Sequence, residues 1–496
     1  MQKKDELRSI MLVGTGSDVG KSLICAGLGR LFYQDGYCPA PFKAQNMSLN
    51  SYPTLDGLEI GRAQAVQAEA CKLSCRVEMN PILLKPTTDQ KSQVILNGKV
   101  IGNQTAREYF LGKDRDKLFE EVSKSYTRLA NEFNPVVLEG AGSISELNLK
   151  DKDIVNMRMA LASDAAVYIV ADIDRGGVFG SLYGTMELLD EKERAQIEGI
   201  IINKFRGDIS LFDSGIETLE RICKVPVVGV LPFFRDIYIE EEDSVGLKQF
   251  YYQDKGDLIN IAVVLLDKMS NFTDFNVLER HPLVNLFYTD RSEDLDKAQI
   301  IILPGSKNTI SDLQSLRKKK LDNEVINAAK SGKTVIGICG GYQMLGNHIY
   351  DPKCIEGNLK ETKGLGLLPI TTTISEEKIC RQRTFCFRYD EQTHSANEAY
   401  EIHMGETTLK HDSYMNILDD GSYEGCFISP KIWGSYLHGI LDNSCVIKSL
   451  LSPYSHCVTD DFVNYKEFKD KEYDRLASVI RKHLNMNLVY KALKKF

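Results

Sequence analysis

The 496-residue sequence lacks the patterns that mark secreted, membrane-spanning and zinc-stabilised proteins. Its twelve cysteines include no Cys-x-x-Cys pair, so neither a zinc site nor a redox pair of that kind is expected. No apolar run approaches the ~20 residues that span a bilayer, and the charged first residues include no signal-peptide core. The formal charge of −8 argues against nucleic acid or an anionic membrane as partner. Unpaired cysteines fit the reducing cytosol, so a cytoplasmic protein is expected.

The composition is globular, with 43% hydrophobic and 26% charged residues. A chain of this length is expected to form two or three domains, and it has no internal repeat or low-complexity segment. All eight histidines follow residue 280. Any chemistry that needs an imidazole therefore belongs to the second half of the chain.

That second half contains a strand that turns into a helix around one cysteine. Thr334 to Ile338 is a short apolar run, Cys339 follows it, and two glycines precede a helical stretch. This pattern predicts a nucleophile elbow that carries sulfur in place of a hydroxyl. A helix N-terminus beneath the sulfur would favour the thiolate. The alternative is a buried structural cysteine, which is the commoner role of this residue type.

A thiolate needs a base, and His438 is the best candidate. It ends a short apolar strand, and Gly439 beside it leaves room for a substrate. Taken alone, a histidine at a strand end is more often structural. Paired with Cys339, it predicts acyl transfer through a thioester.

The first half contains a phosphate-binding loop in its required setting, after a strand and before a helix. Gly14 to Ser22 reads Gly-Thr-Gly-Ser-Asp-Val-Gly-Lys-Ser, with Thr15 where the strict pattern has Gly. The backbone N–H groups and the lysine would bind phosphates, and the serine hydroxyl would bind Mg²⁺. The alternative is a glycine turn with an accidental Lys-Ser pair. The loop residues expected to bind ATP are Thr15, Gly16, Gly20, Lys21 and Ser22, of which Ser22 is also an expected metal ligand.

Polar side chains end several strands of this first half, and such ends meet at one edge of a parallel sheet. Glu139 closes a buried strand and is predicted to contact Mg²⁺, or else is a strand-end surface charge. Asp174 and Arg175 follow the next strand and suit substrate or phosphate contacts, or a structural ion pair. Gln45 and Asn46 follow an early strand and are candidate substrate contacts.

Strands and helices alternate in both halves, which predicts two α/β domains, each with a doubly wound, mostly parallel sheet. The expected organisation is a P-loop domain at 1–232, an acidic linker at 233–257, a second α/β domain at 258–445 and a helical extension at 446–496. The Ala-rich stretch Glu59 to Ala70 is typical of a surface helix.

Cys339 and His438 in these settings resemble class I glutamine amidotransferase domains, which hydrolyse glutamine to glutamate and ammonia. The strand before Gly305 resembles that family's oxyanion strand, which implies that Gly305 and the Gly340 amide stabilise the tetrahedral intermediate. The family usually has a Glu two residues after the histidine, and this chain has Ile440 there. The group that orients His438 is therefore left open.

The phosphate loop is similar to that of dethiobiotin synthetase and its relatives, which phosphorylate carboxylates. The resemblance implies that Asn203, at the end of a parallel strand, meets adenine. Those enzymes often place a Mg²⁺-binding Asp where this chain has the amides Gln45 and Asn46, so the complete metal ligand set is left open.

Five segments, in order along nearly the whole chain, resemble the cobyric acid synthase family. They are Phe42 to Met47, Gly61 to Ala65, Ala171 to Gly180, Leu303 to Thr309 and Tyr400 to Gly405. The resemblance implies a ligase of cobalamin biosynthesis that amidates several peripheral carboxylates of adenosylcobyrinic acid a,c-diamide, with ATP, Mg²⁺ and glutamine, through an acyl phosphate. Tyr400 and His403, on the last segment, are candidate substrate contacts.

Two alternatives stand beside this one. The sister enzyme, cobyrinic acid a,c-diamide synthase, would have acidic residues in place of Gln45 and Asn46. A P-loop switch or scaffold ATPase with a degenerate glutaminase fold is of another class, and the intact Cys339 and His438 argue against it. The sequence leaves the oligomeric state, the ammonia path and the order of amidations open.

Overall fold

The computed structural model has two compact units, each built around its own sheets. Residues 6–87, 91–112, 115–234, 236–240, 251–356, 359–388, 397–409, 413–454 and 465–494 are described below. Unit 1 comprises Met1–Met47, Glu59–Glu240 and Lys466–Phe496, and unit 2 comprises Ser48–Leu58 and Glu241–Tyr465. The second unit therefore takes a short loop from the first half of the chain, and the first unit takes the C-terminal helices.

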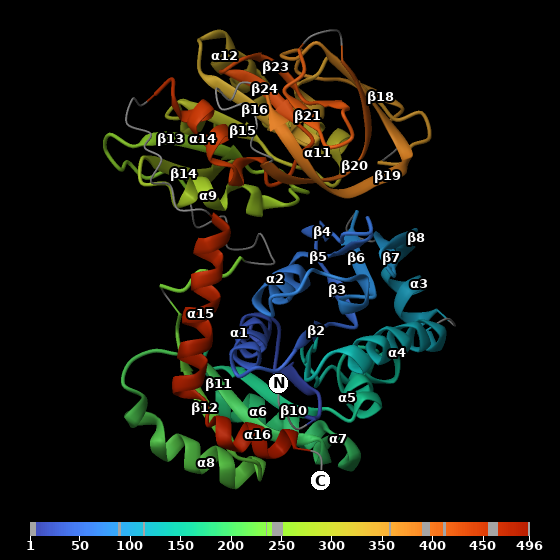
Figure 1. The fold of residues 1–496 in the computed structure, drawn as a ribbon, viewed down its shortest axis with the longest axis vertical. Helices are drawn as coiled ribbons and strands as arrows, with labels where there is room; N and C mark the ends of the chain where they lie inside the picture. The colour runs from blue at the N-terminus through green and yellow to red at the C-terminus, as the bar shows by residue number, and fades with distance from the viewer. Residues whose placement is uncertain are drawn as a thin grey trace. The chain divides into compact units, whose positions relative to one another are not determined.

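Unit 1 is built on six parallel strands in the order β12-β11-β10-β1-β9-β2. They are β1 (Ile10–Gly14), β2 (Ala40–Phe42), β9 (Val136–Glu139), β10 (Ala166–Asp172), β11 (Ile197–Phe205) and β12 (Val227–Pro232). Figure 1 labels β2, β10, β11 and β12 of this sheet. Every residue of β1 and β10 is buried, as expected of a parallel sheet covered on both faces. Because β1 lies between β9 and β10, the carboxyl ends of these three strands meet beside the turn that follows β1.

The helices of unit 1 come from both ends of the chain. They are α1 (Lys21–Gln34), α2 (Arg62–Ala70), α3 (Ala106–Leu111), α4 (Arg115–Glu132), α5 (Met157–Ser163), α6 (Val178–Leu188), α7 (Glu191–Ala195), α8 (Asp213–Cys223), α15 (Tyr465–His483), α16 (Met486–Leu493) and the 3-10 turns η1 (Val77–Met79), η2 (Leu147–Lys152) and η3 (Ile209–Phe212). A Cβ on Gly27 of α1 would lie 2.2 Å from Ile480 of α15, so the glycine allows these helices to pack closely. Leu476, Ile480 and Leu493 share one buried core with α1 and β1.

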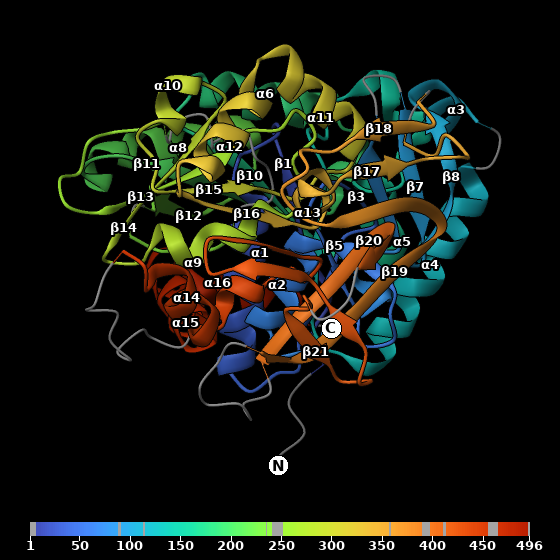
Figure 2. The same cartoon turned by 90° about the horizontal axis from the view of Figure 1, so that it is seen from above.

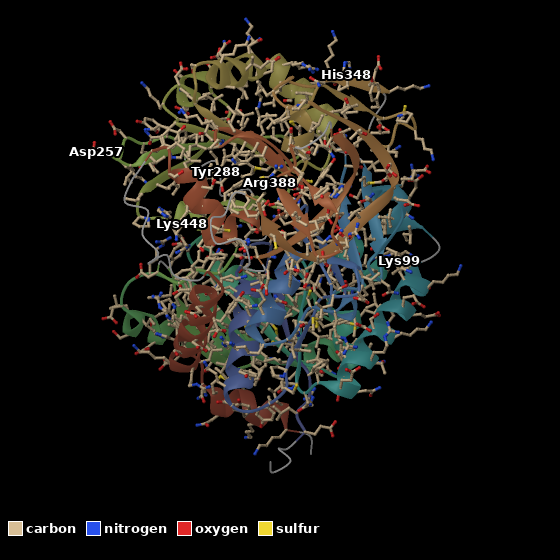
Figure 3. All side chains as sticks on the ribbon, turned by 45° about the horizontal axis from the view of Figure 1, so that its top comes forward. Lys99, Asp257, Tyr288, His348, Arg388 and Lys448 are labelled. Carbon is tan, nitrogen blue, oxygen red and sulfur yellow. The ribbon has the colours of Figure 1, made fainter. Side chains whose placement is uncertain are left out.

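A four-stranded sheet completes unit 1, in the order β3-β6-β7-β8. Its strands are β3 (Gln45–Met47), β6 (Ile82–Pro86), β7 (Lys91–Leu96) and β8 (Lys99–Thr105), and the short strand β5 (Glu59–Gly61) precedes α2. Lys99 projects outward from the edge strand β8 (Figure 3), a charge of the kind that discourages edge-to-edge pairing.

Unit 2 is built on five parallel strands and one antiparallel edge strand, in the order β14-β13-β15-β16-β24-β23. They are β13 (Ile259–Val264), β14 (Val284–Thr289), β15 (Ile300–Leu303), β16 (Thr334–Ile338), β23 (Cys426–Ser429) and β24 (Ile432–Ser435). The helical elements are η5 (Phe272–Phe275), α9 (Asn276–Glu279), α10 (Ser292–Leu295), α11 (Thr309–Lys318), α12 (Leu321–Lys330), α13 (Gly340–Leu345), η6 (Ile440–Asp442) and α14 (Ser444–Leu451). The carboxyl ends of β13, β15, β16 and β24 meet at one edge.

A second, mostly antiparallel sheet of unit 2 has the order β18-β17-β19-β21-β22, with β20 paired to β19. Its strands are β17 (His348–Tyr350), β18 (Glu361–Lys363), β19 (Ile370–Phe387), β20 (Asn397–Leu409), β21 (Asn416–Leu418) and β22 (Tyr423–Glu424). The long β19–β20 pair, drawn in orange, is its main feature (Figure 2). β20 carries the segment from Tyr400 to Gly405.

The prediction of two α/β domains with mostly parallel sheets is confirmed. The predicted extension 446–496 is not one piece, because α14 belongs to unit 2 while α15 and α16 pack in unit 1. Within the acidic linker predicted at 233–257, Glu240 is buried against Arg62 at 2.7 Å, and 241–250 lie outside the described residues. In the part of the chain that is described, no helix combines the length and apolarity needed to cross a membrane.

Candidate active sites

Cys339 stands at a strained turn between β16 and α13. Its backbone has φ 52° and ψ −108°, a left-handed region that L-residues other than glycine rarely adopt. A Cβ on Gly341 would lie 1.9 Å from the carbonyl oxygen of Leu303, and one on Gly337 would lie 2.6 Å from Gly341. The glycines on either side are therefore needed for close approach of the backbone. The structure has the strand–turn–helix shape that the sequence predicts here.

His438 follows β24, is fully buried, and has a carboxylate partner that the sequence did not reveal. Its Nδ1 lies 2.7 Å from Oδ2 of Asp274, in η5. Oδ1 of the same carboxylate accepts from the N–H of Gly439 at 3.0 Å. The two bonds fix the ring and its backbone to one carboxylate. Ile440, where related domains have Glu, is a buried residue of η6 and supplies no such group.

The charges around His438 favour its protonated form. Burial lowers the pKa of His438, but the Asp274 carboxylate and then the neighbouring Cys339 outweigh it and raise that pKa to about 10. In this structure the Cys339 thiol donates to the carbonyl of Ile402 at 3.7 Å. Nε2 of His438 then has no hydrogen-bond partner among the described residues. The free Nε2 faces a thiol close enough to perturb the ring, as a general base requires.

The two glycines predicted to form an oxyanion hole lie beside Cys339 and His438. A Cβ on Gly340 would lie 2.8 Å from the backbone nitrogen of Ser306, and one on Gly305 would lie 3.1 Å from Cε1 of His438. The turn after β15 and the start of α13 are thus adjacent. The two segments that carry the predicted oxyanion-hole glycines therefore lie next to each other, beside Cys339 and His438.

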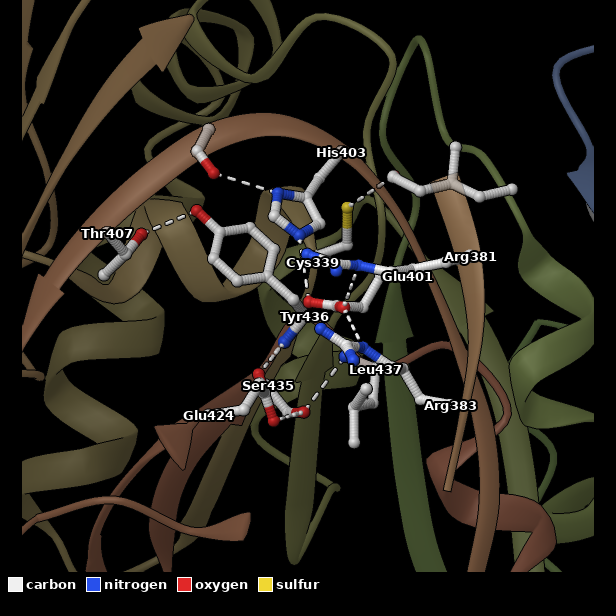
Figure 4. A network of polar contacts seen from close by, with 12 residues as sticks. Cys339, Arg381, Arg383, Glu401, His403, Thr407, Glu424, Ser435, Tyr436 and Leu437 are labelled. Atoms are coloured by element: carbon white, nitrogen blue, oxygen red, sulfur yellow. Dashed lines mark hydrogen bonds and ion pairs between the residues drawn. The ribbon is translucent and has the colours of Figure 1, made fainter. Parts of the chain in front are cut away.

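β20 forms a polar wall next to Cys339 (Figure 4). The ring of His403 stacks on Tyr436, with centroids 3.8 Å apart, and its nitrogens lie 2.9 Å from the carbonyl oxygen of Gly405 and 3.3 Å from Glu401. Both partners, the Gly405 carbonyl and the Glu401 carboxylate, are hydrogen-bond acceptors. Burial raises the pKa of Glu401, but hydrogen bonds from His403 and Arg383 (2.7 Å) outweigh it and lower that pKa.

The phosphate loop of unit 1 has its lysine folded onto backbone carbonyls. Nζ of Lys21 donates to Gly16 at 2.9 Å and to Gly142 at 3.0 Å. Burial lowers the pKa of Lys21, and nearby Glu139 opposes that effect. Gly20, with φ 98°, begins α1 next to Asn203, whose Nδ2 a Cβ on that glycine would meet at 2.1 Å. The loop therefore depends on glycine where the helix starts.

Glu139 is a fully buried carboxylate with three donors. It accepts from Ser22 at 2.7 Å, from Lys43 at 2.8 Å and from Gln67 at 2.6 Å. Burial raises the pKa of Glu139, but Lys43 and these hydrogen bonds outweigh it and lower that pKa. The carboxylate is therefore ionised next to the loop hydroxyl. The alternative of a surface charge is wrong, because Glu139 is 2% exposed.

The helix that supplies Gln67 was predicted to lie on the surface, and that prediction is wrong. In α2, Arg62 to Ala68 are all buried, and Gln64 is 0% exposed. Alanine-rich composition is equally suitable for a tightly packed helix, and composition alone does not separate the two. Gln67, like Lys43, was not among the predicted site residues.

The remaining candidates of unit 1 have these neighbours. Nδ2 of Asn203 donates to the Val19 carbonyl at 2.8 Å, and its buried Oδ1 has no partner among the described residues. The backbone N–H of Thr15 donates to Val170 at 3.2 Å. Gln45 accepts from Tyr109 at 2.6 Å, and Asn46 donates to Gln64 at 3.0 Å. These amides already serve the packing of unit 1.

Asp174 and Arg175 are not paired with each other. Asp174 forms an ion pair with Arg206 at 2.6 Å, while Arg175 lies 3.5 Å from Asp172 and 3.5 Å from Asp18 of the phosphate loop. Both side chains are partly exposed at the same strand ends as the loop. The contact of Arg175 with Asp172 is an Asp–Arg pair of the kind predicted for this strand end, whereas Asp174 pairs with Arg206.

Oxygen donors suited to Mg²⁺ are present at the loop, although the described residues include no group of three or more His, Cys, Asp or Glu that could hold a metal. The Ser22 hydroxyl and the ionised Glu139 carboxylate lie 2.7 Å apart. Mg²⁺ is usually held by one or two such protein oxygens, together with phosphates and water. The residues therefore fit this ion.

The two sites define a glutamine amidotransferase domain joined to a P-loop nucleotide-binding domain. Residues 260–446 match the CobB/CobQ-like glutamine amidotransferase domain, and residues 10–245 match the CobQ/CobB/MinD/ParA nucleotide binding domain. The chain is 54% identical to the cobyric acid synthase of Parabacteroides distasonis, over 99% of this chain and 100% of that protein. It is 45% identical to that of Caldanaerobacter subterraneus, over 98% of this chain and 99% of the relative. The chain belongs to the cobyric acid synthase family.

Proposed function

We propose that this protein amidates several peripheral carboxylates of adenosylcobyrinic acid a,c-diamide, using ATP–Mg²⁺ and glutamine for each. The observation that carries the proposal is full-length similarity to relatives of that name, combined with a nucleophile elbow in one unit and a phosphate loop in the other. The alternative of a switch ATPase is disfavoured, because nucleotide switching does not require a buried Asp274–His438 pair beside Cys339.

In unit 2, Cys339 attacks the side-chain amide carbon of glutamine. Nε2 of His438 takes the thiol proton and then gives it to the departing ammonia, which leaves a glutamyl thioester that water hydrolyses. Asp274 holds Nδ1 and stabilises the imidazolium. The backbone near Gly305 and Gly340 stabilises the tetrahedral oxyanion. Support comes from the strained turn at Cys339 and the unpartnered Nε2.

In unit 1, the phosphate loop binds ATP through Lys21 and its backbone, and Asn203 contacts adenine. The buried Oδ1 of Asn203, which has no partner among the described residues, would accept a hydrogen bond from the exocyclic amine of adenine. Ser22 and Glu139 would hold Mg²⁺, which neutralises charge on the β- and γ-phosphates when bound. A substrate carboxylate attacks the γ-phosphorus, ADP leaves, and ammonia then displaces phosphate from the acyl carbon to form the amide.

Substrate contacts and location complete the proposal. Tyr400 and His403 are assigned to the glutamine site, because both lie with Cys339 and His438 in unit 2. Gln45, Asn46, Asp174 and Arg175 are assigned to the corrin or phosphate side, in unit 1. A cytoplasmic location is supported by the described cysteines, which form no disulfide among themselves.

The test is mass spectrometry of the corrin diamide after incubation with purified protein, ATP–Mg²⁺ and glutamine. Each carboxyl converted should lower the mass by the difference between a hydroxyl and an amino group, in successive steps. Cys339→Ser should block the reaction with glutamine and permit it with ammonium chloride. An unaltered corrin, with ATP turnover that needs no carboxylate, would refute the proposal.

A further inference from the structure

The loop Ser48–Leu58, hereafter the inserted loop, belongs to unit 2 although the chain on both sides belongs to unit 1. It contains the short strand β4 (Ser51–Pro53) and leaves unit 1 directly after β3. Ser48, Asn50 and Ser51 are almost fully buried, so this part of the loop packs against other residues. Its contacts within unit 2 converge on the supports of His438.

The first contact reaches the turn that places Asp274. The backbone N–H of Ser51 donates to Oδ1 of Asn271 at 3.1 Å. Asn271 has φ 52° and begins η5, and its carbonyl accepts from the N–H of Asp274 at 3.1 Å. One residue in the left-handed conformation thus links the inserted loop to the carboxylate that binds the imidazole.

The second contact reaches the imidazole through an aromatic column. The ring of Tyr52 packs edge-on against Tyr400, with centroids 4.8 Å apart and planes at 60°. Tyr400 stacks on His438 at 5.3 Å and 24°, and their backbones exchange hydrogen bonds of 3.0 and 2.8 Å. Gln382 of β19 donates to the carbonyl of Pro53 at 3.0 Å, which holds the loop beside the column.

We propose that the inserted loop is a positioning element of the glutaminase, in which Tyr52 holds Tyr400 against His438 while Ser51 braces the turn that carries Asp274. The inference rests on the glutaminase role proposed above. It assigns Tyr52 no contact with glutamine. It makes the general base depend on a segment tethered at both ends to the ATP-binding unit, through β3 and β5.

The test compares three loop variants in glutamine hydrolysis, measured as glutamate release without the corrin. Tyr52→Ala should lower kcat about tenfold, the scale of one lost aromatic pair, with the KM for glutamine within about twofold. Tyr52→Phe keeps the ring and should restore most of kcat. Leu55→Ala is the matched control, because Leu55 is 72% exposed at the loop tip, and it should behave as the unaltered protein.

Amidation driven by ammonium chloride should be unchanged in Tyr52→Ala, because that reaction bypasses His438. Unaltered glutaminase in a folded Tyr52→Ala protein, or equal loss of the glutamine- and ammonia-driven reactions, would overturn the inference. Should Tyr52→Ala fail to fold, Tyr52→Leu, which keeps apolar bulk without a ring, takes its place with the same two outcomes. Because glutaminase is assayed without the corrin, failure here is distinguishable from a wrong corrin substrate.

Discussion

Asp274→Asn is the substitution that tests the catalytic geometry most directly, because it changes one atom and keeps the shape. In the unaltered protein, the Asp274 carboxylate accepts hydrogen bonds from Nδ1 of His438 and from the N–H of Gly439. An amide cannot accept from both. If its NH₂ group faces the ring, Nδ1 must accept, the proton moves to Nε2, and His438 loses the lone pair that takes the thiol proton. If its oxygen faces the ring, its NH₂ group meets the Gly439 N–H.

The size of the effect follows from the charge that Asp274 supplies. Raising the pKa of His438 from 6.5 to about 10 corresponds to roughly 5 kcal/mol in favour of the imidazolium. Asp274 is the largest cause of that rise, and burial alone acts in the opposite direction. Losing most of this stabilisation should lower glutaminase kcat by about 10²- to 10⁴-fold.

The assay measures glutamate release by the variant. Ammonia-driven amidation is measured in parallel, because it reports the activity of unit 1, which the substitution does not change. Asp267→Asn is the matched control, since Asp267 lies in the same loop before η5 and its side chain is 56% exposed. Glutaminase within about threefold of the unaltered protein, or parallel loss of ammonia-driven activity, would refute the role of Asp274.

In the unaltered protein, the free energy of unfolding should depend on pH through His438. A folded-state pKa above the unfolded value means that the His438 imidazolium stabilises the fold in full below about pH 6.5, and that this contribution is lost as pH rises through about 10. Asp274→Asn should remove most of that dependence. Urea titrations from pH 6 to 10 measure it, and an unchanged slope of stability against pH would contradict the assigned ion pair.

Three further substitutions address the other parts of the two sites. Glu139→Gln should lower ATP-dependent amidation at least about 10²-fold and raise the Mg²⁺ requirement, which a magnesium titration measures. It should also cost about 3–5 kcal/mol of stability, measured by a thermal melt, because the buried Lys43 ammonium loses the charge of this carboxylate. Asn203→Leu should raise the KM for ATP about tenfold and weaken discrimination against GTP, which competition assays measure. Gly341→Ala should destabilise the protein by about 1–3 kcal/mol and abolish glutaminase, because its Cβ would lie 1.9 Å from the Leu303 carbonyl. Gly180→Ala, which meets nothing within 4 Å, is its control.

The strained turn at Cys339 and the phosphate loop could be predicted because their geometry is local. A strand, a strained residue and a helix within a dozen positions leave a readable pattern of glycines around Cys339 or Lys21. Asp274 leaves none, because 164 positions separate it from His438 and only the fold brings them together. Gln67 was missed for a similar reason, since an alanine-rich helix gives no sign of the carboxylate that one of its amides meets.

Charged residues misled the sequence interpretation where burial depended on distant partners. Glu240 begins an acidic run that suggests a solvated connection, yet it pairs with Arg62 at 2.7 Å and lies 3.6 Å from Lys469. Arg62, Glu240 and Lys469 come from three distant parts of the chain. A run of charged residues predicts exposure only when no other element places an opposite charge beside it. Here α15 places Lys469 near Glu240.

The absence of the usual Glu at position 440 does not leave His438, the proposed base, without a carboxylate partner, and the parallel sheet explains why. The carboxyl ends of β13 and β24 open at the same edge, so a side chain from the turn after β13 can reach the imidazole as readily as one placed two residues after it. The requirement is an acceptor at Nδ1, and Asp274 meets it at 2.7 Å. The inserted loop is hydrogen-bonded to the start of η5 through Asn271. An acceptor in this turn is therefore linked to a segment from the first half of the chain, whereas a Glu at position 440 would not be.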